Sequence, residues 1–311
     1  RICDAIARYS KIKVVGLCHQ IGAAYGMVGL VLADLLGIDI PGGEISTHAD
    51  ADIWPRLGAV RDQAMERIEI KAAGLNHFTW MLDVQDLRTG EDLYPIFSER
   101  WAGFGPGFEP LTRRVYDAFG CFPVPGDEHM CEYLPWASDP TTRPWEKYDL
   151  SLYDWDRMDA RRREGRDIIG EMAGGQRGVD GLREADSEGA LEVIEAISAA
   201  SNHYHLAVNL PNDGYISNLP TGAIVEVPGL VSGAGIHGLG MGALPEGVAE
   251  LCRREIAVVQ LCVDAAILGD RQLALQCLLL DPVITDLDVA RAVLDDYLLT
   301  YREYLPQFWQ D

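Results

Sequence analysis

Apolar residues along the chain fall into short runs that end in polar tips. Residues 11–17 (KIKVVGL) form the first run, which stops at Cys18, and residues 68–75 (IEIKAAGL) form another, which continues into Asn76 and His77. Runs of this length with polar residues at their ends predict β-strands. Because reactive side chains in sheet-based folds commonly lie at strand ends, both tips are candidate functional sites.

Most of the remaining pattern is helical. A Gly- and Ala-rich stretch over 21–37 predicts a helix, and residues 157–172 are so charged that their helix should lie in solvent. Apolar residues recur near a spacing of 3.6 from Leu251 to Ile267. Only residues 94–155, rich in aromatic residues, Gly and Pro, suggest irregular structure. Shorter predicted elements are helices over 189–200, 271–280 and 286–304 and a strand over 205–210. The pattern as a whole predicts a helix-rich α+β fold.

Composition is that of an ordinary globular protein, with 48% hydrophobic and 24% charged residues in 311. No internal repeat or flexible linker interrupts the chain, so we predict one compact body. No apolar run approaches the roughly 20 residues that span a bilayer, and residues 1–11 lack the apolar stretch of a signal peptide. We therefore expect a cytoplasmic protein that does not enter membranes.

The formal net charge of −22 argues against nucleic acid as a partner, since phosphate contacts need a basic surface. It does not indicate a cationic ligand, because acidic excess commonly serves solubility.

Seven cysteines are present, an odd number without any CxxC spacing, which is not the pattern of a disulfide framework. Cys18 differs from those in helical apolar patterns, because it follows one predicted strand as His77 follows another. If the two strands are neighbours, a thiolate and an imidazole would meet at the sheet edge, which suits a divalent metal with open coordination positions. A core cysteine and a hydrogen-bonded histidine are the simpler alternative for this pair.

The segment GDEHMCEY, residues 126–133, concentrates titratable groups. Its carboxylates and Tyr133 can act as general bases where burial or a metal tunes them. From spacing alone, a capped helix start with an acidic face is the simpler explanation. The chain contains no G-x-G-x-x-G motif after a strand, no Walker A motif, no G-x-S-x-G and no H-E-x-x-H.

Five segments in order resemble glycoside hydrolase family 4, and within it the α-galacturonidase branch. They are VVGLCHQ (14–20), GLNHFTW (74–80), GDEHMCEYLPW (126–136), NLPNDGYISNLP (209–220) and GALPEGVAEL (242–251). The resemblance implies the C-terminal domain of a fold related to lactate and malate dehydrogenases. It also implies that the N-terminal Rossmann half is missing. Residues 1–20 would be a remnant of its last strand, and residues 21–311 the catalytic, substrate-binding and oligomerisation domain.

By the same resemblance, Cys18 and His77 are the metal ligands, Asn76 contacts the sugar, and His19 lies beside the metal site. The base that removes a proton from the sugar is Asp127 as first choice.

The second choice for that base is Tyr133, and His129 and Glu132 would contact the substrate or surround it. A galacturonide carries a carboxylate, for which Arg113 and Arg114 are candidate partners only because they lie near this segment in the sequence.

The family's chemistry uses NAD and usually Mn²⁺, and differs from two-carboxylate hydrolysis. The resemblance implies oxidation at sugar C3, loss of the C2 proton, elimination of the aglycone, addition of water and return of the hydride. The implied substrate is an α-galacturonide, with α-galactosidase or α-glucosidase specificity, a dehydrogenase, or an inactive remnant as alternatives. We expect a homodimer or homotetramer.

Overall fold

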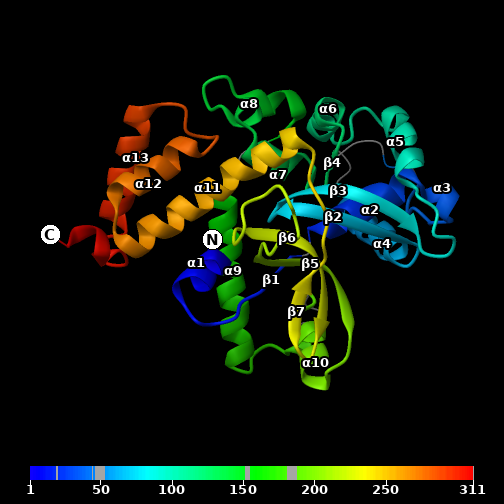
Figure 1. The fold of residues 1–311 in the computed structure, drawn as a ribbon, viewed down its shortest axis with the longest axis horizontal. Coiled ribbons are helices and arrows are strands. Elements are labelled where there is room, and N and C mark those ends of the chain that lie inside the picture. Colours follow the sequence, from blue (N-terminus) through cyan, green and yellow to red (C-terminus); the bar gives the residue numbers. More distant parts are fainter. Residues whose placement is uncertain (19, 44, 46–52, 151–154, 181–187, 311) are drawn as a thin grey trace.

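A seven-stranded antiparallel sheet runs through the middle of the computed structural model (Figure 1). The structure describes residues 1–18, 20–43, 45, 53–150, 155–180 and 188–310. The strand order is β1-β5-β6-β2-β3-β4, and β7 pairs with β6. The strands are β1 (Gly16–Leu17), β2 (Ile68–Leu75), β3 (Phe78–Asp86), β4 (Phe122–Pro123), β5 (His203–Pro211), β6 (Ile224–Ser232) and β7 (Gly235–Gly238).

Helices cover both faces of this sheet and extend it at one end. Those up to the middle of the chain are α1 (Ile2–Tyr9), α2 (Ile21–Val31), α3 (Ala33–Leu36), α4 (Ile53–Met65), α5 (Tyr94–Gly103), α6 (Pro110–Phe119), α7 (Gly126–Tyr133) and α8 (Pro135–Ser138). The later ones are α9 (Trp155–Ala173), α10 (Ala190–Ala199), α11 (Glu246–Leu268), α12 (Arg271–Leu280) and α13 (Leu287–Thr300), with 3-10 turns at Pro144–Tyr148 and Pro306–Trp309.

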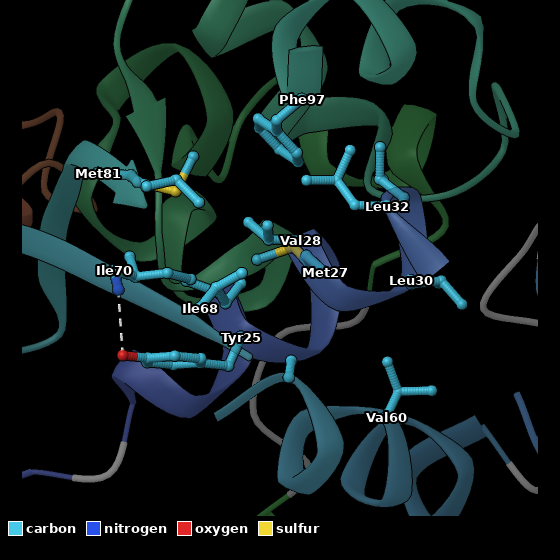
Figure 2. Packing of buried hydrophobic residues seen from close by; sticks show 14 of the residues in the cluster. Tyr25, Met27, Val28, Leu30, Leu32, Val60, Ile68, Ile70, Met81 and Phe97 are labelled. Carbon is cyan, nitrogen blue, oxygen red and sulfur yellow. Dashed lines mark hydrogen bonds between the residues drawn. The ribbon is translucent and has the colours of Figure 1, made fainter. Parts of the chain in front are cut away.

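Alternation along the strands divides the apolar core into two layers. Ile70 and Met81 pack with α2, α4 and α5 on one face, whereas Ala73 and Trp80 pack with α6, α7 and α11 on the other. The first layer is drawn in Figure 2, where the Ile70 amide donates to the Tyr25 hydroxyl at 3.1 Å. The two-residue period of a strand therefore buries both faces of the sheet.

The Gly- and Ala-rich composition of α2 has a packing cause. A Cβ on Gly29 would lie 2.8 Å from Ala64 Cβ in α4, so the two helices approach more closely than a larger residue allows. The following helix, α3, ends at Gly37, whose φ of 65° is the left-handed conformation of a helix terminus. The predicted helix over 21–37 is thus present, divided at Leu32 into α2 and α3.

Residues 246–300 form the helices α11, α12 and α13, and the sequence predicted a helix at each of these places. Helix α12 has the bounds expected for it, α11 covers the whole of its expected range, and α13 covers most of its own. The carboxylates of Asp270 and Asp286 accept backbone N–H groups at the first turns of α12 and α13, which explains where these helices begin. Among the described residues, no helix is long and apolar enough to cross a membrane.

Two sequence expectations were wrong in detail. The strand expected over 11–17 is reduced to Gly16–Leu17, and residues 94–150 of the expected irregular stretch hold α5 to α8. Residues 151–154 of that stretch lie outside the described residues. Short helices there begin at Pro and are interrupted by Gly, which hides their period. Strand 68–75 is confirmed at its predicted bounds. The division of the chain at residue 20 stays a prediction. In the structure, β1 of residues 1–20 belongs to the same sheet as the later strands.

Candidate active site

A row of residues across four strands places a polar pair in the middle of the sheet. Gly16 of β1 lies opposite Asn209 of β5, and Asn209 lies opposite Glu226 of β6. Glu226 in turn lies opposite Gly74 of β2. Because directly opposed residues share one face, the Asn209 and Glu226 side chains meet. A Cβ on Gly16 would lie 3.0 Å from Asn209 Cβ, so glycine leaves room for the asparagine.

Glu226 is the centre of a polar cluster that also contains Asn209, Asn76 and Cys18, which we call the Glu226 cluster. Its side chain is 1% exposed, and its Oε2 accepts Asn209 Nδ2 at 2.8 Å and Asn76 Nδ2 at 3.0 Å. Burial raises the pKa of this carboxyl group above its usual range. Its other oxygen, Oε1, and Asn209 Oδ1 are buried without a hydrogen-bond partner in the described part of the chain. The cluster therefore retains acceptor capacity that the surrounding protein does not use.

Cys18 lies directly after β1 and is a neighbour of this carboxylate. The thiol is 5% exposed, and its Sγ accepts the Gln20 backbone N–H at 3.4 Å. Burial, with the Glu226 charge as a second cause, raises the pKa of the thiol to about 12. Without a cation beside it, this cysteine is protonated at neutral pH. His19, the neighbour predicted to flank the metal site, lies outside the described residues.

The β2–β3 tip carries Asn76 and His77, and Tyr133 of α7 holds it in place. The His77 backbone N–H donates to Tyr133 Oη at 3.3 Å, and this hydroxyl donates to the Asn76 carbonyl at 3.4 Å. The Tyr133 ring stacks on Phe78, with 4.7 Å between ring centroids. These contacts place the predicted sugar contact, one predicted metal ligand and one candidate base together.

His129 and Glu132 extend the same group along α7. The His129 ring lies edge-on to the His77 ring, with 4.8 Å between centroids. Its Nδ1 lies 3.3 Å from Glu132 Oε2, and this contact raises the pKa of the histidine. The four predicted residues Asp127, His129, Glu132 and Tyr133 thus share one short helix, α7. The first turn of this helix lines the cavity described next.

A cavity of about 600 Å³ lies between α2, α4 and the start of α7, with the segments 107–110 and 148–150 closing its sides. Gln20 and His129 line the cavity. Gln20 contacts Cys18, and His129 contacts His77. This volume is in the range of small-molecule sites and can admit a sugar. Arg61 is the only Arg or Lys among the described residues that line the cavity.

Asp127 lines this cavity from the first turn of α7 and is 3% exposed. Its carboxylate accepts the backbone N–H groups of Leu111 at 2.9 Å and Thr112 at 2.7 Å, which caps the start of α6. Burial and the adjacent Glu109 carboxylate raise the pKa of Asp127 to about 7. A carboxyl group that titrates near neutrality in a cavity has the property a general base requires.

Arg113 and Arg114 were the candidate partners of a substrate carboxylate, and the guanidinium of Arg113 is occupied by hydrogen bonds to the backbone. This guanidinium donates to the Trp101 carbonyl at 2.6 Å and to those of Gly105, Phe108 and Phe104, and it lies over the Trp101 ring. Burial lowers its pKa and outweighs the charges of Asp117 and Asp127, which act in the opposite direction. Arg114 lies over the Tyr148 ring, 5.9 Å from its centroid.

The strands that precede Cys18 and His77 are not neighbours, so the condition under which these two side chains would meet directly is not fulfilled. Two strands, β5 and β6, lie between β1 and β2. The link between the two tips is Glu226, which the sequence analysis missed. A single acid in the apolar run 223–231 (AIVEVPGLV) was the available signal. The described residues contain no group of three or more His, Cys, Asp or Glu side chains placed to hold a metal.

The chain belongs to glycosyl hydrolase family 4, because the model of the family 4 C-terminal domain matches residues 72–284. This confirms the resemblance and the α+β fold class predicted from the sequence. An α-galacturonidase of Bacillus subtilis is 28% identical over 92% of this chain and 61% of its own length. An α-galactosidase of Rhizobium meliloti is 27% identical over 98% of this chain and 58% of its own length. The chain thus spans about three fifths of these relatives.

Solved structures share the fold. The Bacillus subtilis protein lplD, named as a glucosidase, is similar with a TM-score of 0.72 and 26% identity, over 92% of this chain and 63% of that chain. A 6-phospho-α-glucosidase from gut microorganisms, solved in complex with NAD and Mn²⁺, has a TM-score of 0.65 and 20% identity over 97% of this chain and 64% of that chain.

Proposed function

We propose that this chain is the catalytic and substrate-binding part of an NAD- and Mn²⁺-dependent α-glycosidase. The observation that carries this proposal is the Glu226 cluster, which brings the predicted metal ligand Cys18 next to the tip that holds Asn76 and His77. Family membership and the NAD and Mn²⁺ complexes of structural neighbours support the choice of cofactors.

The donor set fits a divalent cation held by two protein ligands. A thiol and an imidazole are both metal ligands, and only two of them leave coordination positions for sugar oxygens. When bound, the cation would polarise sugar hydroxyl oxygens and NAD would accept and return a hydride. The buried Glu226 carboxyl group lies beside the Cys18 thiol, and a carboxylate next to a metal-binding thiolate is consistent with positive charge at this place.

A residue of this chain would then accept the proton that leaves sugar C2. Asp127 faces the cavity with a pKa near neutrality, and we propose that it accepts the proton from sugar C2. Tyr133 is the second candidate, because its hydroxyl contacts the Asn76–His77 tip. Burial raises the pKa of this phenol, so Tyr133 would need the cation to lose its proton, whereas Asp127 would not.

The direct test joins this chain to a complete N-terminal dinucleotide-binding domain and assays an aryl-α-galacturonide with NAD, Mn²⁺ and a reductant. We expect release of free sugar without net formation of NADH. Net NADH formation would indicate a dehydrogenase, and no turnover of any α-glycoside would contradict the proposal. Cleavage of neutral α-galactosides alone would retain the class of enzyme and change the substrate.

We further propose that the substrate is an α-galacturonide whose carboxylate binds Arg61. This arginine is the described cation of the cavity, its Nε donates to Asp62 at 2.9 Å, and its side chain is still 43% exposed. Charged hydrogen bonds of about 1.5–3 kcal/mol correspond to about 10- to 150-fold in rate or affinity.

Arg61→Ala should therefore lower kcat/KM for the galacturonide by about 10- to 150-fold and leave the value for the neutral α-galactoside nearly unchanged. Arg61→Lys should fall between, because lysine cannot bind a carboxylate with two parallel N–H groups. Kinetics on the two aryl glycosides, with Arg88→Ala as control on an exposed turn, measure this. Equal loss on both substrates would show that Arg61 does not read the carboxylate.

A further inference from the structure

We propose that Glu226 is a positioning residue that turns the Asn76 side chain so that its carbonyl oxygen faces the ligand. Asn76 then serves as a hydrogen-bond acceptor for a sugar hydroxyl group. This inference rests on the proposed function, since it names how the same site holds its substrate.

The orientation of the amide follows from elementary hydrogen-bond chemistry. Asn76 Nδ2 donates to Glu226 Oε2 at 3.0 Å, so the NH₂ of Asn76 faces the carboxyl group, and this is the orientation that an acceptor oxygen favours. The same holds for Asn209, which shares Oε2 at 2.8 Å. Amide oxygen and nitrogen are hard to distinguish by position alone, but a carboxylate partner decides between them. Asn76 Oδ1 therefore points away from Glu226.

Rigid structure fixes the carboxylate that sets this orientation. Glu226 is 1% exposed in the middle of β6, and its strand pairs with β5 on one side and β2 on the other. Asn209, 5% exposed, holds the same oxygen from β5. A buried oxygen that accepts two hydrogen bonds has little freedom to reorient. The Asn76 amide therefore adopts the orientation that the Glu226 carboxylate favours.

Asn76 itself lies at an exposed tip and is held from two sides. Its side chain is bonded to Glu226, and its backbone carbonyl accepts the Tyr133 hydroxyl at 3.4 Å. Gly74 makes this tip possible: its φ is 154°, and a Cβ there would lie 2.4 Å from the Phe78 carbonyl oxygen. With the NH₂ and the backbone carbonyl engaged, the side-chain oxygen is the group presented outward.

A double-mutant cycle on the full chain separates positioning from a direct role. Binding of D-galacturonic acid is measured by titration calorimetry at saturating Mn²⁺ for the wild-type chain, Glu226→Leu, Asn76→Ala and the double variant. In the wild-type background Glu226→Leu should weaken binding by about 3- to 10-fold, the effect of one neutral hydrogen bond. In the Asn76→Ala background the same change should have no further effect, because Glu226 acts through Asn76.

Two further variants control for folding. Glu226→Gln offers its amide oxygen to both asparagines and should bind sugar within about twofold of wild type. Glu69→Leu is the matched control, because it makes the same glutamate-to-leucine change at the end of β2 that is remote from Asn76. Glu69 lies 4.0 Å from Lys71 there, and its replacement should leave binding unchanged. Thermal unfolding of every variant establishes the temperature range in which each is folded.

The outcomes separate this inference from the proposed function. Additive losses in the cycle, or no loss in Glu226→Leu, would overturn the inference while the wild-type chain still binds sugar. No binding of D-galacturonic acid by the wild-type chain would overturn both together. If Asn76→Ala weakens binding of Mn²⁺ alone but not of sugar, the outward oxygen faces the cation, and the hydroxyl assignment is wrong.

Discussion

Cys18→Ser should lower the turnover of the proposed glycosidase, measured on this chain joined to a dinucleotide-binding domain, by at least about 10³-fold. Loss of a Lewis acid removes several kcal/mol of transition-state stabilisation, and each 1.36 kcal/mol is a factor of ten. His77→Ala should have an effect of similar size, because both side chains are proposed to hold one cation. Glycoside cleavage at saturating Mn²⁺ measures both effects.

Matched controls exist for both changes. Cys262→Ser alters a half-buried cysteine of α11, and His237→Ala alters an exposed histidine of β7. Both should retain wild-type turnover. Wild-type activity in Cys18→Ser, or full activity after removal of divalent metal by a chelator, would contradict the assignment.

Asp127→Asn should lower turnover by about 10²- to 10⁴-fold, the range for loss of a general base. The wild-type rate should also fall as the pH drops through about 7. Burial and Glu109 raise the pKa of Asp127 to this value, and the protonated carboxyl can no longer accept the C2 proton. The pH dependence of kcat/KM measures this limb, which should be absent in Asp127→Asn.

Tyr133→Phe is the comparison that decides between the two candidate bases. It should cost less than about tenfold, through looser packing of the Asn76–His77 tip. Because the Asp127 carboxylate also caps α6, the unfolding free energy of Asp127→Asn must be measured to show that the variant is folded during the assay. A large loss in Tyr133→Phe with little loss in Asp127→Asn would assign the base to the tyrosine.

Local patterns in the sequence were sufficient for the parts of the fold whose period is regular. Strand β2 and helix α12 have the bounds that alternation and helical spacing predict, because each is long enough to show its period. The helices between α5 and α8 span only four to ten residues, and proline at their starts and glycine between them concealed the pattern.

The candidate site was predicted only in part, since its two tips are joined through residues far apart in the chain. Cys18 and His77 could be selected because each follows an apolar run, but nothing local places Glu226 between them. Its contact with Asn76 spans 150 residues and depends on strand pairing. Arg61 and Glu109 were missed for the same reason, because each reaches the cavity from an element without a recognisable motif.

The shared cation is tested most directly by the absorption spectrum of the chain titrated with Co²⁺. A thiolate bound to Co²⁺ gives a strong charge-transfer band in the near ultraviolet, which imidazole and water ligands do not give. We expect the band in the wild-type chain, its loss in Cys18→Ser, and a weaker affinity in His77→Ala. A band of equal strength in Cys18→Ser, or no band at saturating Co²⁺ in the wild type, would show that Cys18 and His77 do not form the proposed metal site.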